Sequence, residues 1–313
     1  MRVVQADADV ALDEVSAVVT VGFFDGVHLG HRAVLGRTVE AARERRARPV
    51  AITFDRHPRE VLTPGKEPRL LTTVERKAAL IAETGIEALV VIPFTAAFSQ
   101  IPAERFVRDV LVGGVHARHA VMGANFTFGH RALGTVDVLP AMGAPYGLTA
   151  EGVGLLEVDG RTVSSSSVRE ALGAGDLDWP RVALGRRFTL DGEVVSGHGR
   201  GAGLGFPTAN LRTWPRLLLP GQGIYAGVAE LDGTRYRAAI DVGTNPTFGV
   251  EPLHVEAFLL DFEDRDLRGR PIAIEFWARL RDEVKYDAVD DLIAAIADDV
   301  RRTRAIVPDA ETS

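Results

Sequence analysis

The fold expected for the first half of the chain follows from the stretch Val18-Val19-Thr20-Val21-Gly22-Phe23-Phe24-Asp25-Gly26-Val27-His28-Leu29-Gly30-His31. The apolar, mostly β-branched run Val18–Val21 predicts a buried parallel strand. Three glycines mark the turn that follows, and a polar, arginine-rich helix is expected over residues 32–46. α/β folds bind phosphate groups at such a junction, because backbone N–H groups and the helix N-terminus point at the anion. His28 and His31 are three residues apart, so both can face one bound triphosphate.

A histidine near a helix start is most often a cap or a surface residue, and the stretch is neither a Walker loop nor GxGxxG. Taken together, however, residues 25–31 directly after a strand resemble the (H/T)xGH motif of the nucleotidyltransferase superfamily, in the GxFDGVHxGH form of bacterial FAD synthetases. The resemblance implies that His28 and His31 are catalytic. It also implies an ATP phosphate site that includes Gly22, Phe23, Asp25 and Gly30.

Length and composition indicate a two-domain globular protein. The 313 residues suffice for two domains of about 150 residues each, and 46% hydrophobic with 25% charged residues is ordinary for a globular chain. A net charge of −7 argues against a nucleic-acid partner. No apolar run reaches the ~18 residues of a membrane span, and no signal-peptide core follows Met1, so we expect no membrane association and a cytoplasmic location. The absence of cysteine excludes disulfides and thiol catalysis.

The rest of the first half alternates strands with helices. Strands are expected over residues 49–54, 88–93 and 119–122, and helices over 73–84 and 102–111. This alternation predicts a doubly wound parallel sheet, a Rossmann-like domain, in which ligands bind beyond the carboxyl ends of the strands.

Two of the strand-end loops carry candidate flavin-binding residues. His57 by itself reads as a turn residue, but its segment resembles the TFxPHP loop of the FAD synthetases, with Arg56 in place of a proline. Residues 125–129 resemble the family's NFxFG loop, whose aromatic rings can flank an isoalloxazine ring; the alternative is that both phenylalanines are core residues. The flavin-binding set implied by the resemblance is Phe54, His57, Asn125, Phe126 and Phe128.

A serine cluster precedes the next helix. Ser167 and Glu170 have capping-box spacing, which favours a helix N-terminus. The segment also resembles the family's SSTxIR motif, which implies that Ser165 and Ser166 bind the triphosphate and that Arg169 neutralises charge on the leaving pyrophosphate. A short helix over residues 177–185 then leads to an expected domain boundary near residue 185.

Beyond residue 185 the pattern changes to short strands separated by turns. Strands are expected over residues 188–195, 224–231, 236–242, 255–261 and 272–280, with a hairpin turn at Asp232-Gly233. This pattern predicts a small antiparallel barrel. A terminal amphipathic helix over residues 287–304 is expected to pack on it through Val289, Leu292, Ile293, Ile296 and Val300.

The second candidate site begins with a run of alternating glycines, which alone is weak evidence for a phosphate loop. The residues that follow, Pro207-Thr208-Ala209-Asn210, make it specific: Thr208 and Asn210 point the same way in an extended segment and offer neutral oxygens suited to Mg²⁺. The whole segment resembles the riboflavin kinase motif GRxLGFPTANL, except that Ala202 stands where a basic residue is common. The resemblance implies ATP-binding roles for Gly199, Arg200, Gly201 and Gly205.

Phosphoryl transfer to a hydroxyl needs a carboxylate that orients or deprotonates it. Glu256 lies in an apolar strand, where an inward carboxylate is costly without a function, although an outward position is the plain alternative. Its segment resembles the vEvHLLDF stretch of riboflavin kinases, with Ala257 and Phe258 as departures. The resemblance implies that Glu256 is the catalytic base.

The chain thus resembles the bacterial bifunctional riboflavin kinase/FMN adenylyltransferase family over residues ~15–305. The resemblance implies a nucleotidyltransferase domain over residues 1–185 and a riboflavin kinase-like barrel over 186–313. It implies riboflavin, FMN and ATP as substrates, FAD as product and Mg²⁺ as cofactor, in a monomer or weak homo-oligomer. Two alternatives stay open: a single active half, or a non-catalytic flavin-binding carrier.

Overall fold

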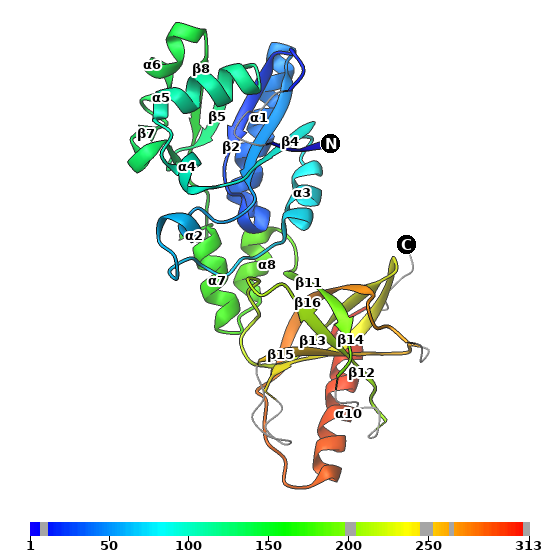
Figure 1. Ribbon diagram of the computed structural model, residues 1–313. Coiled ribbons are helices and arrows are strands. Elements are labelled where there is room, and N and C mark those ends of the chain that lie inside the picture. The colour runs from blue at the N-terminus through cyan, green and yellow to red at the C-terminus, as the bar shows by residue number, and fades with distance from the viewer. Residues whose placement is uncertain (7–11, 198–204, 245–252, 263–265, 309–313) are drawn as a thin grey trace. The chain divides into compact units, whose positions relative to one another are not determined.

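The structure is a computed structural model that describes residues 1–6, 12–197, 205–244, 253–262 and 266–308. Its contacts divide the chain into two compact units, Met1–Ser165 and Ser166–Ser313 (Figure 1).

The first unit is built on a six-stranded sheet in the order β1-β4-β3-β2-β5-β8, and all its strand pairs are parallel. The strands are β1 (Arg2–Gln5), β2 (Ala17–Val21), β3 (Arg48–Phe54), β4 (Ala88–Ile92), β5 (Ala117–Gly123) and β8 (Thr149–Val153). The doubly wound parallel sheet is confirmed. The edge strands β1 and β8 escaped the sequence analysis because β1 is mostly exposed, β8 has no fully buried residue, and both lack the continuous apolar run of a buried strand.

The main helix of this unit, α1 (Leu29–Arg45), packs on β2, β3 and β5. It begins three residues earlier than expected, because His28 caps it: the Nδ1 atom of His28 accepts a hydrogen bond from the backbone N–H of His31. The helix expected over 102–111 is present as α5 (Ala103–Arg105), continued by the π-helical segment η2 (Phe106–Gly114). The other elements are η1 (Asp25–Val27), α2 (Arg59–Leu62), α3 (Val74–Ala82), α4 (Ala96–Ser99), α5 (Ala103–Arg105), η2 (Phe106–Gly114), β6 (Thr127–Phe128), η3 (His130–Ala132), β7 (Gly134–Thr135), α6 (Leu139–Gly143), η4 (Ala144–Tyr146), β9 (Glu157–Val158) and β10 (Arg161–Thr162).

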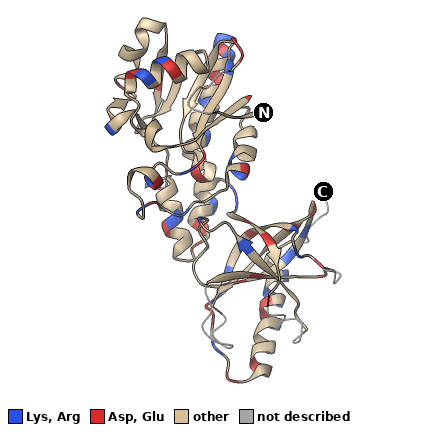
Figure 2. Ribbon diagram, viewed as in Figure 1, with Lys and Arg blue, Asp and Glu red and all other residues tan. Residues whose placement is uncertain are grey.

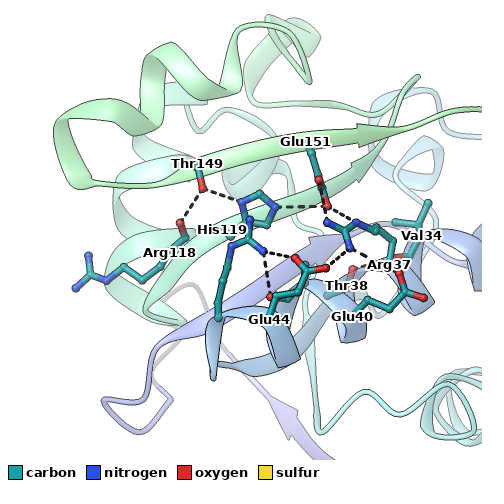
Figure 3. A network of polar contacts seen from close by, with 11 residues as sticks. Val34, Arg37, Thr38, Glu40, Glu44, Arg118, His119, Thr149 and Glu151 are labelled. Carbon is teal, nitrogen blue, oxygen red and sulfur yellow. Dashed lines mark hydrogen bonds and ion pairs between the residues drawn. The ribbon is translucent and has the colours of Figure 1, made fainter.

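A polar network ties α1 to β5 and β8 (Figure 3). Arg37 of α1 donates to Glu44 on the same helix and to both carboxylate oxygens of Glu151 on β8. His119 of β5 is 4% exposed and shares a hydrogen bond of 2.7 Å, through Nδ1, with the hydroxyl of Thr149. Its Nε2 atom lies 3.5 Å from a carboxylate oxygen of Glu151. The edge strand β8 is therefore held by polar contacts as well as by its ladder to β5.

The second unit is a closed antiparallel barrel with a terminal helix, as expected. Its strands follow the order β11-β12-β15-β14-β13-β16 around the barrel. The elements are α7 (Ser165–Gly173), α8 (Asp178–Leu184), β11 (Thr189–Val195), β12 (Thr208–Thr213), β13 (Gly223–Leu231), β14 (Thr234–Gly243), β15 (His254–Leu259), β16 (Pro271–Arg281) and α10 (Val289–Ile306). The turn at Asp232-Gly233 is confirmed: Leu231 pairs with Thr234, and both turn residues have positive φ, as in a type I′ hairpin.

The helix α10 packs against β13, β14 and β16. Four of the five apolar residues expected at this contact are half-buried, but Val289 is 54% exposed, so that expectation is wrong for the first turn of the helix. The interface also holds a buried ion pair that the apolar pattern did not reveal. Arg281 of β16 donates to both oxygens of Asp299, a carboxylate residue that is 3% exposed.

Basic and acidic residues are interspersed along the elements of both units (Figure 2). Within the described residues, no helix combines the length and the apolar character needed to cross a bilayer.

The network around His119 predicts a pH dependence of stability. Burial, and then the positive charge of Arg45, lower the pKa of His119, so the folded unit favours the neutral ring. As the pH falls below about 6.5, this histidine is protonated more readily in the unfolded chain than in the folded unit. The free energy of unfolding therefore decreases. We expect the melting temperature to fall between pH 7 and pH 5.5, and to fall less in His119→Gln.

The control is His130→Gln, which changes a histidine of the same unit outside this network. Glu151 contributes little in this window, because its lowered pKa moves its own titration further into acid. An unchanged pH slope in His119→Gln would contradict the role given to this ring.

Candidate functional site

The candidate site of the first unit lies where the strand order of the sheet reverses. From β2 the sheet continues through β3 and β4 in one direction, and through β5 in the other. Ligands of doubly wound sheets bind at the carboxyl ends of the strands that flank such a point. The turn after β2 and the loop after β5, which flank this point, both carry predicted motifs.

The turn after β2 has an unusual backbone. Phe24, Gly26 and Val27 all have positive φ, at 52°, 76° and 40°, and such values are strained for phenylalanine and valine. A Cβ on Gly22 would lie 2.7 Å from the ring of Phe24, so only glycine fits there. Strain of this kind persists only where the surroundings fix the backbone, and it is concentrated at functional sites.

Asp25 fixes this turn. Its side chain is 2% exposed and accepts hydrogen bonds from the backbone N–H groups of Leu71 and Thr72, at 3.0 to 3.2 Å. The hydroxyl of Thr72 in turn accepts from the N–H of Gly26. Asp25 therefore anchors the segment before α3 to the turn, and its direct contact with ATP stays a prediction.

The two histidines lie together, as the spacing predicted. Their rings are stacked with centroids 3.6 Å apart, and His28 is 6% exposed. Because Nδ1 of His28 accepts from the backbone, a neutral His28 carries its proton on Nε2, where it can donate to an anion. The ring of Phe24 meets His31 edge-on at 5.4 Å. A Cβ on Gly30 would lie 3.2 Å from the ring of His28, so this glycine lets the ring pack closely.

The serine cluster is divided between the two units. The hydroxyl of Ser165 donates to the backbone carbonyl of Asp25 at 3.0 Å, so Ser165 reaches the predicted phosphate turn. Ser166 and Arg169 belong to the second unit, and their phosphate roles stay predictions. The expected capping box is wrong, since α7 starts at Ser165 and Ser167 lies inside it, where it accepts from the indole N–H of Trp179.

A pocket of about 790 Å³ opens between the turn after β2 and the loop after β5. Aromatic rings dominate its wall. The lining residues include Phe23, Phe24, His31, Phe54, His57, Phe94, Phe98, Phe106, Asn125, Phe126 and Phe128. All five residues predicted to bind flavin thus lie around one cavity. Phe128 is 7% exposed and belongs to the hydrophobic core, as the alternative had it, while it also lines this pocket; its contact with flavin stays a prediction.

His57 takes part in the wall of this pocket through Phe23, whose ring it meets edge-on at 4.9 Å. Its orientation is fixed locally: Nδ1 accepts from the N–H of Arg59, and its backbone N–H donates to Glu60. Arg56, the departure from the family loop, pairs with Asp55 instead of facing the pocket wall.

Sequence reasoning missed Lys77, which lies in α3 and is 1% exposed. Burial lowers the pKa of its ammonium group to about 8, and the charges of Asp25 and Asp55 offset only part of this effect. A signal was available: Lys77 shares the apolar face of its helix with Leu80 and Ile81, at spacings of three and four residues.

In the second unit, three polar residues form one row across the barrel. Asn210 of β12 is paired with Glu256 of β15, and Glu256 is paired with Asp241 of β14. Directly opposed residues of an antiparallel pair share a face, so these three side chains lie on the same face of the sheet. The hydroxyl of Thr208 donates to Glu256 at 2.8 Å, and His254 lies 3.3 Å from the other carboxylate oxygen. The predicted metal ligands and the predicted base are thus neighbours.

Gly197, just after the end of β11, lies close to Asn210. A Cβ on Gly197 would lie 2.2 Å from the side-chain nitrogen of Asn210, so only glycine allows this contact. A pocket of about 600 Å³ is lined by Gly197, Gly205, Thr208, Asn210 and Phe258, among others. Gly205 thus lies beside the predicted ligands, whereas Gly199, Arg200 and Gly201 lie outside the described residues.

Asp241 is the second residue that sequence reasoning missed. Burial, followed by the charges of Glu283 and Glu256, raises the pKa of its carboxyl group to about 7. Its Oδ1 atom is buried and has no hydrogen-bond partner among the described residues. The signal was a lone carboxylate in the apolar strand Ala238-Ala239-Ile240-Asp241-Val242.

The donor set of the second unit fits a hard divalent cation. Thr208 and Asn210 offer neutral oxygens on one face of β12, next to the Glu256 carboxylate. Among the described residues there is no group of three His, Asp or Glu side chains placed to hold a metal ion. A cation here would therefore depend on these few oxygens together with water and the oxygens of a bound ligand, as is common for Mg²⁺.

Comparison with known proteins gives consistent results over both units. Residues 11–167 match the family described as FAD synthetase, and residues 184–307 match the family described as Riboflavin kinase. Three curated relatives carry the name bifunctional riboflavin kinase/FMN adenylyltransferase. The *Bacillus subtilis* protein is 34% identical over 92% of this chain and 91% of its own length. The *Pseudomonas fluorescens* protein is 36% identical over 92% of each chain, and that of *Escherichia coli* K12 is 33% identical over 90% of each.

A solved structure from *Streptococcus pneumoniae*, titled a macrolide-efflux protein, has a TM-score of 0.86 and 28% sequence identity to this chain. The match covers 97% of this chain and 99% of the other, so the likeness includes both units.

The contacts of Asp25 predict that it supports the fold of the first unit. Asp25→Asn removes the charge and one acceptor from a buried carboxylate that serves several N–H donors. We expect it to lower the free energy of unfolding by about 1.5–3 kcal/mol, the range for hydrogen bonds to charged groups. Urea denaturation followed by circular dichroism measures this. The exposed Asp137→Asn is the control and should leave stability unchanged; equal stability of both variants would contradict the anchoring role.

Proposed function

The chain belongs to the family of bifunctional riboflavin kinase/FMN adenylyltransferases and is an enzyme of FAD biosynthesis, and from this premise we propose which of its residues perform each step. Adenylyl transfer to FMN is assigned to residues 1–185 and phosphorylation of riboflavin to residues 186–313. The observation that carries the proposal is a pocket in each unit beside candidate groups: His31, which stacks on His28, lines the first pocket, and Thr208, which donates to Glu256, lines the second.

In the adenylyl-transfer step, a phosphate oxygen of FMN attacks the α-phosphorus of ATP. The bond to the β-phosphate breaks, pyrophosphate leaves, and FAD is the product. Because the FMN phosphate is already a nucleophile, catalysis depends on positioning and on stabilising charge. We assign that stabilisation to His28, His31 and Arg169, with Ser165 and Ser166 as further donors. The aromatic pocket, with Asn125 at its edge, is of the kind that holds an isoalloxazine ring.

In the kinase step, the 5′-hydroxyl of riboflavin attacks the γ-phosphorus of a second ATP, and ADP leaves. Glu256 is assigned to accept the hydroxyl proton. Its hydrogen bond from Thr208 holds the carboxylate in place before the substrate binds. Thr208 and Asn210 are the residues that would hold Mg²⁺, which when bound neutralises charge on the ATP phosphates.

The substrates are therefore riboflavin, FMN and ATP, and the proposed cofactor is Mg²⁺. We place the enzyme in the cytoplasm, where ATP is available, as a monomer or weak homo-oligomer. The two alternatives differ in product. A chain with one active half would make only FMN from riboflavin or only FAD from FMN, and a flavin carrier would leave riboflavin unchanged. Incubation with riboflavin, ATP and Mg²⁺, followed by chromatographic separation of the flavins, distinguishes them.

The first functional prediction is that the two activities are separable. His28→Ala removes one of two stacked rings from the first site and should abolish conversion of FMN to FAD, while riboflavin is still phosphorylated and FMN accumulates. Glu256→Gln keeps the size of the side chain but removes the base, and should slow the kinase step by about 10²–10⁴-fold. It should still convert supplied FMN to FAD.

Both half-reactions are measured on both variants, with thermal melts to establish folding. Loss of both activities in either folded variant would show that the two steps share a site, against the assignment made here.

The second functional prediction concerns Asn210. Asn210→Ala should weaken kinase activity at limiting Mg²⁺, and a raised Mg²⁺ concentration should restore part of it. Gly197→Ala should give a similar Mg²⁺ dependence, because the added methyl group displaces the Asn210 side chain. Gly36→Ala is the control, since a Cβ at that helical position meets no atom within 4 Å. Wild-type kinetics in Asn210→Ala at limiting Mg²⁺ would remove this residue from the metal site.

A further inference from the structure

Lys77 is a buried cation that the proposed mechanism does not use. It lies in α3, behind the wall of the aromatic pocket, and is not itself a lining residue. Only 1% of its surface is exposed. Burying an ammonium group away from water costs free energy unless ion pairs and hydrogen bonds replace its lost hydration.

The surroundings of Lys77 offer little such replacement. Its Nζ atom makes one long hydrogen bond, of 3.4 Å, to the hydroxyl of Thr53. The two carboxylates whose charges reach it are both engaged elsewhere: Asp25 accepts from Leu71 and Thr72, and Asp55 pairs with Arg56 and accepts from the N–H of Phe94. Within the described residues, no carboxylate forms an ion pair with Lys77.

The ammonium group of Lys77 is also in contact with Phe23. The Nζ atom lies 3.9 Å from the centroid of the Phe23 ring, within the range of a cation–π interaction. A second connection runs through Thr53, whose hydroxyl donates to the backbone carbonyl of Phe23 at 3.1 Å while it accepts from Lys77. The lysine thus holds both the side chain and the main chain of one residue.

Phe23 links Lys77 to the aromatic pocket of the first unit. It follows Gly22 in the strained turn after β2, lines the aromatic pocket, and contacts the ring of His57. We infer that Lys77 is a positioning residue of the adenylyl-transfer site, which fixes Phe23 and thereby the wall against which the flavin ring of FMN binds. This inference rests on the proposed function of the first unit.

The test separates function from stability. Lys77→Met keeps a long, unbranched side chain but removes the charge. We expect the KM for FMN to rise by up to about 30-fold, the size of a desolvated cation–π contact, with kcat changed much less. Quenching of flavin fluorescence on FMN binding should weaken in parallel. Because a poorly solvated buried charge is removed, the melting temperature should stay the same or rise.

The control is Lys66→Met, which removes an exposed lysine from the segment before α3 and should leave all these quantities unchanged. The riboflavin kinase activity serves as an internal control in every variant. An unchanged KM for FMN in Lys77→Met overturns the inference. A fall in melting temperature that accompanies the loss of FMN affinity also overturns it, since Lys77 would then be a structural residue.

A second variant keeps the test decisive if Lys77→Met does not fold. Thr53→Val removes the hydroxyl that links Lys77 to the carbonyl of Phe23, at nearly constant volume. It should raise the KM for FMN in the same direction, and a KM equal to that of the wild type overturns the inference. In the double variant, the two effects should be less than additive, because both residues act on Phe23.

The pH profile provides an independent measure. Since the pKa of Lys77 is about 8, its charge is lost as the pH rises through that value, with Asp25 and Asp55 as the charged groups that act on it. The wild-type KM for FMN should therefore rise above pH 8, whereas that of Lys77→Met should be flat. Failure of the proposed function has a different signature, namely that His28→Ala still converts FMN to FAD.

Discussion

The buried carboxylate of Asp25 is the contact on which the first site depends. The turn after β2 contains residues in conformations that phenylalanine and valine do not adopt without support. Hydrogen bonds from Leu71 and Thr72 to Asp25 supply that support, and the carbonyl of the same residue receives the hydroxyl of Ser165. One residue thus brings together three segments that are far apart in the sequence, and the stacked histidines follow directly from the turn it holds.

The second site depends on strand register instead. Asn210, Glu256 and Asp241 share a face only because β12, β15 and β14 pair as they do; a shift by one residue would turn each side chain to the other face. Because the barrel is closed, it has no free edge strand, and every strand is held in register by a neighbour on each side. The barrel therefore positions its polar row through backbone hydrogen bonds, whereas the first unit positions its histidines through a side chain.

The sequence predicted the parts of this structure that local patterns encode. Apolar runs identified the four central strands, and glycine-rich motifs identified the segments that contain His28 and His31, at the start of α1, and Thr208 and Asn210, in β12. The edge strands were missed because strands without buried residues have no clear apolar pattern. The positive φ of Phe24 and Val27 could not be foreseen, since nothing in those residue types favours it. The partners of Lys77 could not be foreseen either, because Phe23 and Thr53 reach it only through tertiary packing.

Removing a charged side chain from water costs free energy, and the buried charges of this protein differ in how that cost is offset. Arg281 and Asp299 form a paired contact with several hydrogen bonds, which ties α10 to the barrel and explains why both charges are tolerated. Lys77 and Asp241 have no such ion pair among the residues that the structure describes, and burial shifts the pKa of each group toward neutral pH, to about 8 for Lys77 and about 7 for Asp241. Each lies next to a residue of a candidate site: Lys77 contacts Phe23 of the aromatic pocket wall, and Asp241 is paired with Glu256, the proposed base. Unpaired charges of this kind are expected where function, rather than stability, has fixed the residue.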